Sequence, residues 1–383
     1  MACKIKKLYK IHMEKILIVF GTRPEAIKMA PLVKEFQKYP DRFDVKICVT
    51  AQHREMLDQV LIFFDICPDY DLNLMKPNQN LFQLTADILV GMKNIIEECQ
   101  PDYVFVHGDT TTSTATALSA FYSHVKVCHI EAGLRTFDKN SPFPEEINRQ
   151  ITGRIADLHF APTKTSSDNL LAENVNPKKI FITGNTVIDA LLMAQEKLQS
   201  YEDEEIVNLK ALLNFTKKII LVTGHRRENF GDGFISICNA LKEIALNNDV
   251  IIVYPVHLNP NVQKPVNEIL GNIHNIHLVN PLGYPAFSWL MAKSFFIITD
   301  SGGVQEEAPS LGIPVLVMRS NTERPEAVDA GTVKLVGTNS ASIVYESTLL
   351  LNDKDIYSKM SLAHNPYGDG KSVLRILKTL QDA

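Results

Sequence analysis

Residues 295–317 constrain the fold of this chain more than any other part of its sequence. They predict a buried strand at 295–299, a polar turn at 300–303, a short helix and a second buried strand at 314–317. The first strand is a run of Phe, Ile and Thr without polar alternation, which is typical of a parallel strand covered on both faces. The stretch therefore indicates an α/β protein with a parallel sheet.

The turn inside this stretch has the composition of a phosphate-binding loop. Ser301, Gly302 and Gly303 stand at the start of the helix, where unpaired backbone N–H groups and the helix dipole favour an anion. Glu306 and Glu307 follow. Small residues suit any strand–turn–helix connection, and the acids could serve the helix dipole alone. A carboxylate beside a phosphate is also placed to bind ribose hydroxyls.

Strand and helix signals alternate along almost the whole chain of 383 residues, which is long enough for two domains. This alternation predicts parallel sheets with helices on both faces. The expected strands are 15–20, 45–50, 103–107, 125–130, 158–161 and 180–183 in the first half, then 218–223, 250–254, 276–279, 295–299, 315–318 and 333–336. Each half therefore has enough strands for its own doubly wound sheet, and we place the hinge near 183–187.

Composition excludes several classes of function. The net charge is −5 with both signs interspersed, so the chain predicts neither a nucleic-acid surface nor a membrane-binding one. Six scattered cysteines form no CxxC pair and no zinc-ligand spacing. No apolar run approaches the roughly 20 residues that span a bilayer. Residues 1–12 are basic without a signal-peptide core, and Met13 opens the first strand, so we expect 1–12 to be an N-terminal extension or a misassigned start, and the protein to be cytoplasmic.

Ligands of doubly wound sheets bind at the carboxyl ends of the strands, so the residues that follow each strand are the informative ones. After the first strand, Arg23 stands at a helix start and Lys28 lies about one turn further along. An anion could be held there, although solvated bases at a helix start would look the same.

Carboxylates follow later strands of the first half. Asp109 lies in HGDTTT and could simply cap the next helix, the commonest role of Asp in such a place. Glu131 directly follows an apolar strand and precedes a glycine turn, which is harder to explain structurally. Glu145 lies in SPFPEEINR, in the first turn of a helix, where it or Glu146 could merely stabilise the dipole.

The second half places cations and aromatic residues after its strands. The segment GHRREN brings His225 and two arginines to a strand end, and Arg324 stands at a later helix start. Leu282 and Phe287 lie in a turn-rich loop whose backbone and ring could hold a base, or which could be ordinary loop packing. Carboxylates gather at the edge of the first sheet, and phosphate-binding groups gather at the edge of the second. This arrangement predicts a nucleotide-linked ligand but does not identify the reaction.

Nine motifs in order make the chain resemble one known family. They are FGTRPEAIKMAPL, TAQHREMLDQV, HGDTTT, HIEAGLRT, SPFPEEINRQ, TGNTVIDAL, GHRREN, DSGGVQEEAPSLG and TERPEAVDAGT. Together they are similar to the non-hydrolysing UDP-N-acetylglucosamine 2-epimerases, bacterial and archaeal isomerases that make UDP-N-acetylmannosamine for surface polysaccharides. The resemblance runs from about Met13 to the C-terminus.

The resemblance implies the GT-B fold, in which two Rossmann-like domains with doubly wound parallel sheets hold the active site in the cleft between them. We expect an extension at 1–12, a carboxylate-bearing domain at 13–186, a UDP-binding domain at 187–366 and a helix at 367–383 that crosses back to the first domain.

The resemblance also implies a role for each candidate residue. Ser301, Gly302 and Gly303 would bind the diphosphate, and Glu307 the ribose. The Leu282 backbone and the Phe287 ring would hold uracil. The remaining positions are Arg23, His225 and Arg324 along the diphosphate, Lys28 as support, and Asp109, Glu131 and Glu145 as acid–base carboxylates.

The implied reaction explains the need for several acids. The C2 proton of the sugar is not next to a carbonyl, so the family eliminates UDP to give 2-acetamidoglucal and then adds UDP back. Removing a proton from one face and returning it to the other requires groups on two sides, and general acid–base assistance contributes on the order of 10²–10⁴-fold per group. No cofactor or metal is expected. The motifs do not tell which carboxylate removes the first proton.

Some positions depart from the family pattern. Phe143 stands where Trp is usual, which we expect to be a tolerated packing change.

Gln52, His53 and His257 lie in motifs similar to those that line an activating UDP-N-acetylglucosamine site in some relatives. Glu55 and Asn78 differ from the strongly regulated relatives.

Three alternatives remain: a hydrolysing epimerase, a GT-B glycosyltransferase that uses a UDP-sugar donor, and an inactive nucleotide-sugar sensor. The three first-half carboxylates favour an epimerase over a transferase, and no loss of an acid points to a sensor. A homodimer is expected only because dimers are the commonest soluble assemblies.

Overall fold

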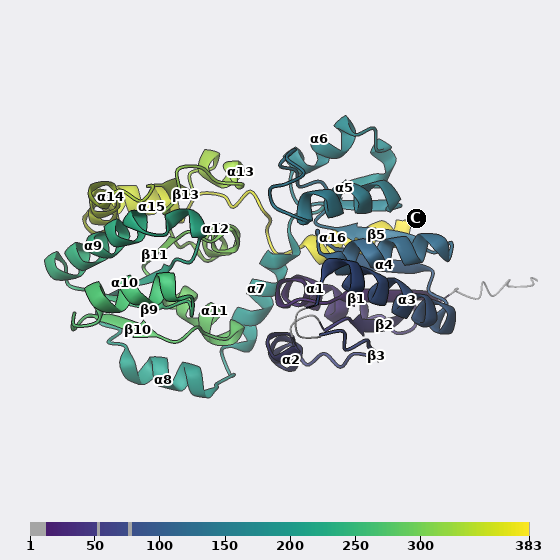
Figure 1. The fold of residues 1–383 in the computed structure, drawn as a ribbon, viewed down its shortest axis with the longest axis horizontal. Helices are drawn as coiled ribbons and strands as arrows, with labels where there is room; N and C mark the ends of the chain where they lie inside the picture. Colours follow the sequence, from purple (N-terminus) through teal and green to yellow (C-terminus); the bar gives the residue numbers. More distant parts are fainter. Residues whose placement is uncertain (1–12, 52–53, 76–78, 383) are drawn as a thin grey trace, which may run out of the picture. The chain divides into compact units, whose positions relative to one another are not determined.

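The computed structural model describes residues 13–51, 54–75 and 79–382. Its contacts divide the chain into two compact units (Figure 1). Unit 1 contains the described residues up to Thr186 together with those from Lys371 onward. Unit 2 runs from Val187 to Gly370.

Unit 1 is built on a seven-stranded sheet in which every neighbouring pair is parallel. The strand order is β3-β2-β1-β4-β5-β6-β7. The strands are β1 (Glu14–Phe20), β2 (Phe43–Val49), β3 (Tyr70–Asp71), β4 (Tyr103–His107), β5 (Lys126–Ile130), β6 (Leu158–Ala161) and β7 (Ile180–Ile182). The helices are α1 (Arg23–Phe36), α2 (Arg54–Phe63), α3 (Leu81–Cys99), α4 (Thr111–Tyr122), α5 (Glu145–Ile155), α6 (Lys164–Ala172) and α16 (Ser372–Asp382), with a 3₁₀ turn η1 at Pro177–Lys179.

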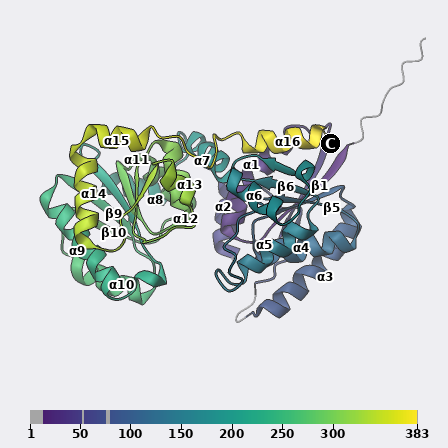
Figure 2. The same ribbon diagram turned by 90° about the horizontal axis from the view of Figure 1, so that it is seen from above.

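Helices cover both faces of the unit 1 sheet. Val104 and Val106 of β4 belong to a buried cluster that includes side chains of α3 and α4. Phe105, between them, points to the opposite face, where its ring packs on Phe36 of α1 at 5.5 Å between centroids. Helix α16 contacts α1 and lies along this second layer (Figure 2). Because both faces are buried, the strands are continuous apolar runs, as expected for a parallel sheet.

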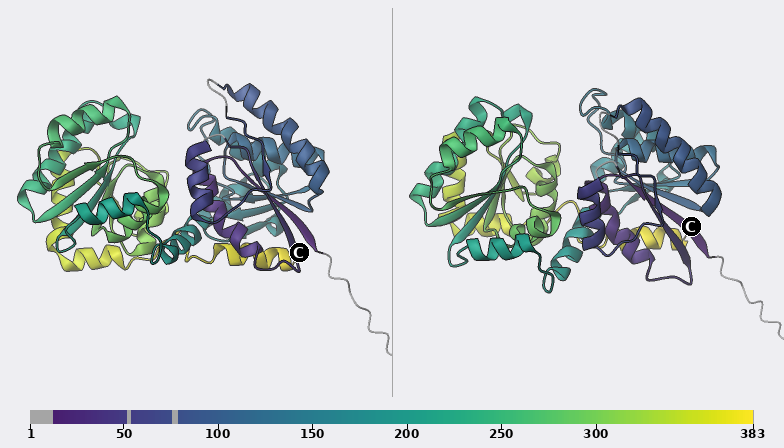
Figure 3. Two further views of the ribbon diagram at one scale, coloured as in Figure 1. Left: turned by 90° about the horizontal axis from the view of Figure 1, so that it is seen from below. Right: turned by 60° about the horizontal axis from the view of Figure 1, so that its bottom comes forward.

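Unit 2 has a six-stranded parallel sheet in the order β10-β9-β8-β11-β12-β13. Its strands are β8 (Lys218–Thr223), β9 (Val250–Pro255), β10 (Ile276–Val279), β11 (Phe296–Thr299), β12 (Val315–Val317) and β13 (Val333–Leu335). Its helices are α7 (Thr186–Lys197), α8 (Glu204–Leu212), α9 (Asp232–Asn247), α10 (Pro260–Leu270), α11 (Tyr284–Lys293), α12 (Gly302–Glu307), α13 (Pro325–Asp329), α14 (Ser340–Asn352) and α15 (Lys354–Ser361), with 3₁₀ turns η2 (Arg227–Asn229) and η3 (Ala308–Leu311). Helices flank the strands on two sides (Figure 3), and α9, α10 and α14 supply one buried cluster.

The prediction of two Rossmann-like parallel sheets is confirmed, and each of the twelve expected strands is present with its ends within two residues. The two-residue strand β3 was missed because two residues are too few to produce a periodic signal. The prediction of a loop over 281–287 is wrong from Tyr284 onward, where α11 begins. Pro285 lies in the first turn of that helix, where its missing N–H costs no hydrogen bond.

In each sheet the strand order reverses between two adjacent strands, β1 and β4 in unit 1 and β8 and β11 in unit 2. Ligands of such sheets bind at the carboxyl ends of the strands on either side of this reversal. The turns after β4, β8 and β11 carry the predicted site residues Asp109, His225 and Ser301, and Arg23 begins the helix after β1. None of the helices in the described part of the chain is long and apolar enough to cross a membrane.

The loop after β5 depends on a glycine. At Gly133, φ is +92° and an added Cβ would lie 2.1 Å from the backbone oxygen of Ser166. We predict that Gly133→Ala destabilises the protein by more than about 3 kcal/mol, because neither backbone can move without breaking the unit 1 packing. Gly337 is the control, since its φ is +63° but an added Cβ would meet nothing within 4 Å. Gly337→Ala should cost only about 1 kcal/mol. Urea unfolding followed by circular dichroism measures both, and equal losses would contradict the steric explanation.

Candidate active site

A buried carboxylate joins the first two turns at the carboxyl edge of the unit 1 sheet. Glu25, in the first turn of α1, accepts hydrogen bonds from the backbone nitrogens of Gly21 (3.0 Å) and Thr22 (2.8 Å). It also accepts one from the Thr110 hydroxyl after β4 (2.6 Å). Burial raises the pKa of Glu25, and these hydrogen bonds oppose the rise. Sequence reasoning missed this residue, although the spacing of Thr22 and Glu25 is a capping-box signal.

Asp109 does not cap the helix that follows it, so the capping interpretation is wrong. Thr110 caps α4 instead, by accepting from the backbone nitrogen of Ser113 (3.1 Å). The Oδ2 atom of Asp109 accepts from Nε of Arg149 (2.9 Å) and lies 2.8 Å from its Nη2. Burial raises the pKa of Asp109, and the Arg149 charge opposes that rise. Asp109 is therefore a partly buried carboxylate, with its side chain 24% exposed, that is held by a cation.

Glu131 has a left-handed backbone with φ of +60°, an uncommon conformation for a residue with a side chain. Its carboxylate pairs with Lys28 and accepts from Nδ2 of Asn185 (2.8 Å). Lys28, expected to support the site, thus lies against one of the predicted acid–base groups. Strained backbone of this kind is concentrated at functional sites.

His107 lies beside Glu131, with its Nε2 atom 3.8 Å from Oε2 of Glu131. Burial lowers the pKa of His107 to about 4, so the ring is neutral near pH 7. Among the described residues, its Nε2 atom has no hydrogen-bond partner. Sequence reasoning missed this histidine, because it is the last residue of a strand and looks like part of the core.

The two adjacent acids at the start of α5 differ sharply. Glu146 is fully buried and accepts from the Thr136 backbone (3.0 Å) and the Gln150 side chain (2.9 Å). Burial alone would raise the pKa of Glu146, but its hydrogen bonds outweigh this effect, and the net result is a lowered pKa. Glu145 is the first residue of α5, and its buried Oε2 atom has no partner among the residues that the structure describes. Glu146 is thus an anchor of the loop before it, whereas Glu145 keeps an oxygen free of protein bonds.

These groups share one edge of the unit 1 sheet. Asn148 and Arg149 of α5 both bond to Asp109, and an added Cβ at Gly108 would lie 3.7 Å from Oε1 of Glu131. Arg23 opens α1 at the same edge and is partly buried. The structure therefore brings the predicted first-half residues together around the ends of β1, β4 and β5.

Unit 2 repeats the arrangement with a different carboxylate. Asp300, fully buried after β11, accepts from the backbone nitrogens of His225 and Arg226 after β8, both at 2.8 Å. The Nδ1 atom of His225 lies 3.5 Å from Oδ1 of Asp300. Burial lowers the pKa of His225, and the Asp300 charge opposes this. The His225 ring, whose side chain is 45% exposed, is therefore mainly neutral at pH 7.

Two guanidinium groups face the predicted phosphate turn. Helix α12 begins at Gly302 with Ser301 as its N-cap residue. A Cβ added at Gly302 would lie 3.9 Å from Nη2 of Arg324 and 4.0 Å from Nη2 of Arg226. Arg324, a predicted site residue, also pairs with the buried Glu306. Arg226 was not among the predicted residues, although its motif was noted, because a sequence does not show which of two adjacent arginines points to the turn.

The remaining predicted binding residues also lie at this edge of unit 2. Oε1 of Glu307 is 3.8 Å from the position of a Cβ on Gly303. Leu282 follows β10 and is partly buried. Phe287 lies in the first turn of α11, with its backbone nitrogen bonded to Gly283 (2.9 Å). Carboxylate, cations and an aromatic ring are thus gathered around the ends of β8, β10 and β11.

Comparisons with known proteins decide the family. The family model described as UDP-N-acetylglucosamine 2-epimerase matches residues 34–381. The chain belongs to the UDP-N-acetylglucosamine 2-epimerase family. A Campylobacter jejuni protein of that name is 59% identical over 373 residues, which cover 96% of this chain and 97% of the relative.

Solved structures of this epimerase family have the same fold. A Neisseria meningitidis UDP-GlcNAc 2-epimerase, crystallised with UDP-GlcNAc, matches with a TM-score of 0.86 and 50% identity, over 96% of this chain and 100% of the other. The Methanocaldococcus jannaschii UDP-GlcNAc 2-epimerase matches with a TM-score of 0.85 and 34% identity, over 96% and 100%. The GT-B type of fold expected from the sequence is confirmed.

The residues expected at an activating site of the epimerase are only partly described. Gln52 and His53 lie outside the described residues. The His257 ring stacks on that of His225, with centroids 5.4 Å apart and planes inclined by 14°. His257 is therefore in contact with a residue of the candidate active site.

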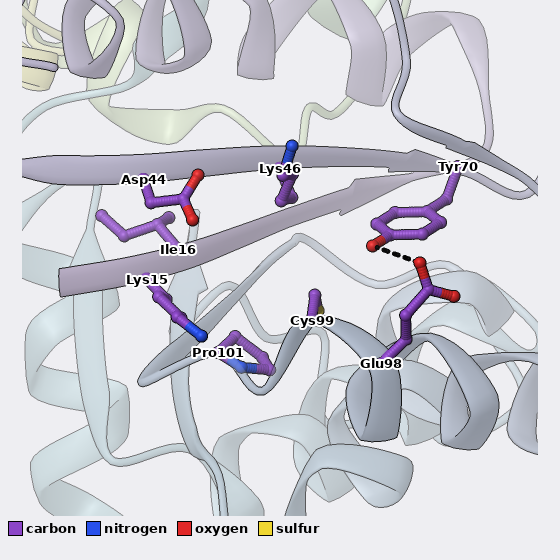
Figure 4. Close-up of a pocket in the computed structure, with 8 residues that line it drawn as sticks. All are labelled: Lys15, Ile16, Asp44, Lys46, Tyr70, Glu98, Cys99 and Pro101. Atoms are coloured by element: carbon purple, nitrogen blue, oxygen red, sulfur yellow. Dashed lines mark hydrogen bonds between the residues drawn. The ribbon is translucent and has the colours of Figure 1, made fainter.

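A cavity of about 360 Å³ lies at the opposite, amino edge of the unit 1 sheet (Figure 4). Its lining residues are Lys15, Ile16, Asp44, Lys46, Tyr70, Glu98, Cys99 and Pro101. Tyr70 donates to Glu98 (3.2 Å), and Lys46 pairs with Asp69 (2.9 Å). Burial raises the pKa of Cys99 to about 11, so its thiol is protonated and a poor nucleophile near pH 7. This cavity is not part of the epimerase site.

Asp300 is the residue on which the unit 2 site depends structurally. We predict that Asp300→Asn destabilises unit 2 by about 1–3 kcal/mol, because both backbone nitrogens bond to the same oxygen, Oδ2, and would lose an ionised acceptor when the carboxylate becomes a neutral amide. The control is Asp249→Asn, which removes an exposed pair with Lys217 (2.7 Å) and should cost less than about 1 kcal/mol. Trp289, the only tryptophan in the sequence, lies in unit 2 and reports its urea unfolding by fluorescence. Equal midpoints for the two variants would refute this role of Asp300.

Proposed function

We propose that this chain catalyses the reversible C2 epimerisation of UDP-N-acetylglucosamine to UDP-N-acetylmannosamine without releasing free sugar, as a cytoplasmic step that supplies surface polysaccharide synthesis. The observation that carries the proposal is the cluster of Asp109, Glu131 and Glu145 at one sheet edge, with Glu145 keeping an oxygen free of protein bonds among the described residues. The names of the relatives support the substrate class.

In the proposed reaction a carboxylate takes the C2 proton while the C1–O bond to UDP breaks. The electron pair of the C–H bond forms the C1–C2 double bond of 2-acetamidoglucal, and UDP leaves with the C–O pair. The reverse addition then delivers a proton to the other face of C2. Asp109, whose pKa is raised by burial, suits both halves of this cycle, since a carboxylate with a raised pKa can both accept and return a proton. We do not assign the first base to one of the three acids.

The unit 2 residues are proposed to hold the UDP moiety. Ser301, Gly302 and Gly303 would bind the diphosphate beside Arg324 and Arg226, whose charges would stabilise the leaving group. His225 would contribute to the same step, with Arg23 from unit 1. Glu307 would bind the ribose, and Leu282 and Phe287 the uracil. The proposal therefore requires that one substrate molecule reaches residues of both units.

The alternatives differ in their use of the carboxylates. A GT-B glycosyltransferase would move the sugar to an acceptor and would have no use for three acids at the edge of unit 1. A hydrolysing epimerase would use similar acids but would release N-acetylmannosamine.

A homodimer stays a prediction, and the exposed apolar side chains of Val90 on α3 and of Phe121 and Tyr122 on α4 are compatible with it.

The test is incubation of the purified protein with UDP-N-acetylglucosamine in D₂O with EDTA, followed by NMR of the sugar nucleotides. We expect UDP-N-acetylmannosamine with deuterium at C2, because the abstracted proton is exchanged with solvent. Glu145→Gln should lower the rate by about 10²–10⁴-fold. The control variant Glu97→Gln, an exposed acid on α3 outside the site, should leave it unchanged.

Free N-acetylmannosamine with UDP would instead identify a hydrolysing enzyme. Unchanged substrate despite intact UDP binding would refute the acid–base roles. The glycosyltransferase and the inactive sensor would then be the remaining candidate functions. Loss of activity with EDTA that returns on adding a divalent cation would overturn the expectation of metal independence.

We further propose that UDP-N-acetylglucosamine activates the enzyme at a second site that includes His257 and, from the sequence, Gln52 and His53. The support is that the His257 ring stacks on His225, so a ligand that moves His257 would act on the site. We predict that the initial rate with pure UDP-N-acetylmannosamine rises when a trace of UDP-N-acetylglucosamine is added. Hyperbolic rates that its addition does not change would refute this second site.

A further inference from the structure

Arg149 joins a proposed acid–base carboxylate to a structural one. Its Nε and Nη2 atoms both reach Oδ2 of Asp109, at 2.9 and 2.8 Å. Its Nη1 atom donates to Oε2 of Glu146 at 3.2 Å. The Arg149 side chain is 14% exposed, so these bonds lie largely out of water. Hydrogen bonds between ionised groups in such surroundings are strong and directional.

Glu146 extends this connection to the polypeptide between Glu131 and Glu145. Its two oxygens accept from the backbone nitrogens of Thr136 (3.0 Å) and Phe137 (3.3 Å). Neither Arg149 nor Glu146 was among the predicted site residues. Together they form a continuous chain of bonds from Asp109 to the loop that separates the other two carboxylates.

We propose that Arg149 is a positioning residue, which holds the Asp109 carboxylate in its reacting orientation and ties it through Glu146 to the loop between Glu131 and Glu145. The inference rests on the proposed function for its catalytic consequence. The planar guanidinium meets two carboxylates at fixed angles, which an ammonium group cannot do. Without this hold, rotation about the two side-chain torsions of Asp109 could turn its carboxylate toward Lys28 or solvent.

The charges around Asp109 give this role a second consequence. The charges that act on Asp109 are the cations of Arg149 on α5 and Lys28 on α1 and the carboxylate of Glu131 after β5. Burial and Glu131 raise the pKa of Asp109, whereas Arg149 and Lys28 lower it. Removing the Arg149 charge must therefore raise the pKa of Asp109. The limb of the pH–rate profile that belongs to Asp109 then moves to higher pH, whether Asp109 acts ionised or protonated.

The experiment compares Arg149→Gln and Arg149→Lys with the control Arg154→Gln, an exposed arginine on the same helix that bonds to the backbone oxygen of Glu173 (3.1 Å). Arg149→Gln should lower kcat about 100-fold, because a misplaced catalytic group costs that much, with a much smaller change in KM. Compared with Arg149→Gln, Arg149→Lys should bring the pH profile closer to that of the wild type than it brings kcat. Lysine supplies the positive charge but not the planar guanidinium that bonds to two carboxylates. Arg154→Gln should behave like the wild type.

A second readout does not depend on activity. In protein labelled with ¹³C at the Asp carboxyl carbons, the signal missing from Asp109→Asn identifies Asp109. The pH midpoint of that signal's titration should move to higher pH in Arg149→Gln and should be unchanged in Arg154→Gln. An unshifted midpoint, or an Arg149→Gln variant with wild-type kcat, overturns the proposal. If the wild type does not epimerise, the proposed function fails, and the NMR titration still decides whether Arg149 holds Asp109.

Discussion

Two buried carboxylates, Glu25 and Asp300, hold the edges on which the candidate site is built. Each accepts backbone N–H groups from the turn after the first strand of its unit, Glu25 from Gly21 and Thr22, Asp300 from His225 and Arg226. Each also lies at the reversal of strand order, where an open parallel sheet leaves the ends of two adjacent strands without a crossing helix. Without these acceptors, buried N–H groups would be left unpaired, which costs more than the hydrogen bonds contribute when made.

Around these anchors the two units carry opposite kinds of side chain. Unit 1 carries three acids at one edge of its sheet, and Lys28 and Arg149 each pair with one of them. A carboxylate buried without such a partner would simply take up a proton. Unit 2 directs Arg226 and Arg324 to a glycine turn. The edge of unit 1 therefore suits the proton transfers that we propose, and the edge of unit 2 suits the diphosphate binding that we propose.

Adjacent residues in this chain have unequal roles. Glu145 and Glu146 follow one another at the start of α5. Glu146 accepts a hydrogen bond from the backbone of the preceding loop, whereas one oxygen of Glu145 has no partner among the described residues. Arg226 and Arg227 stand side by side, yet Arg226 reaches the predicted phosphate turn whereas Arg227 is exposed. In both pairs the geometry of the backbone at a helix start or a 3₁₀ turn directs one side chain inward and the next elsewhere.

The sequence by itself determined the parallel strands, the turns at their carboxyl ends and the order of the motifs, because apolar runs and glycine turns are local signals. It also indicated the family, which came from motifs rather than from periodicity. Only the tertiary structure decided what each acid does. Asp109 looked like a helix cap until Arg149, 40 positions away, was seen to hold it, and Lys28 reaches Glu131 across 103 positions. A local pattern cannot show such partners, because the proton affinity and orientation of a buried carboxylate are set by groups that only folding brings within hydrogen-bond distance.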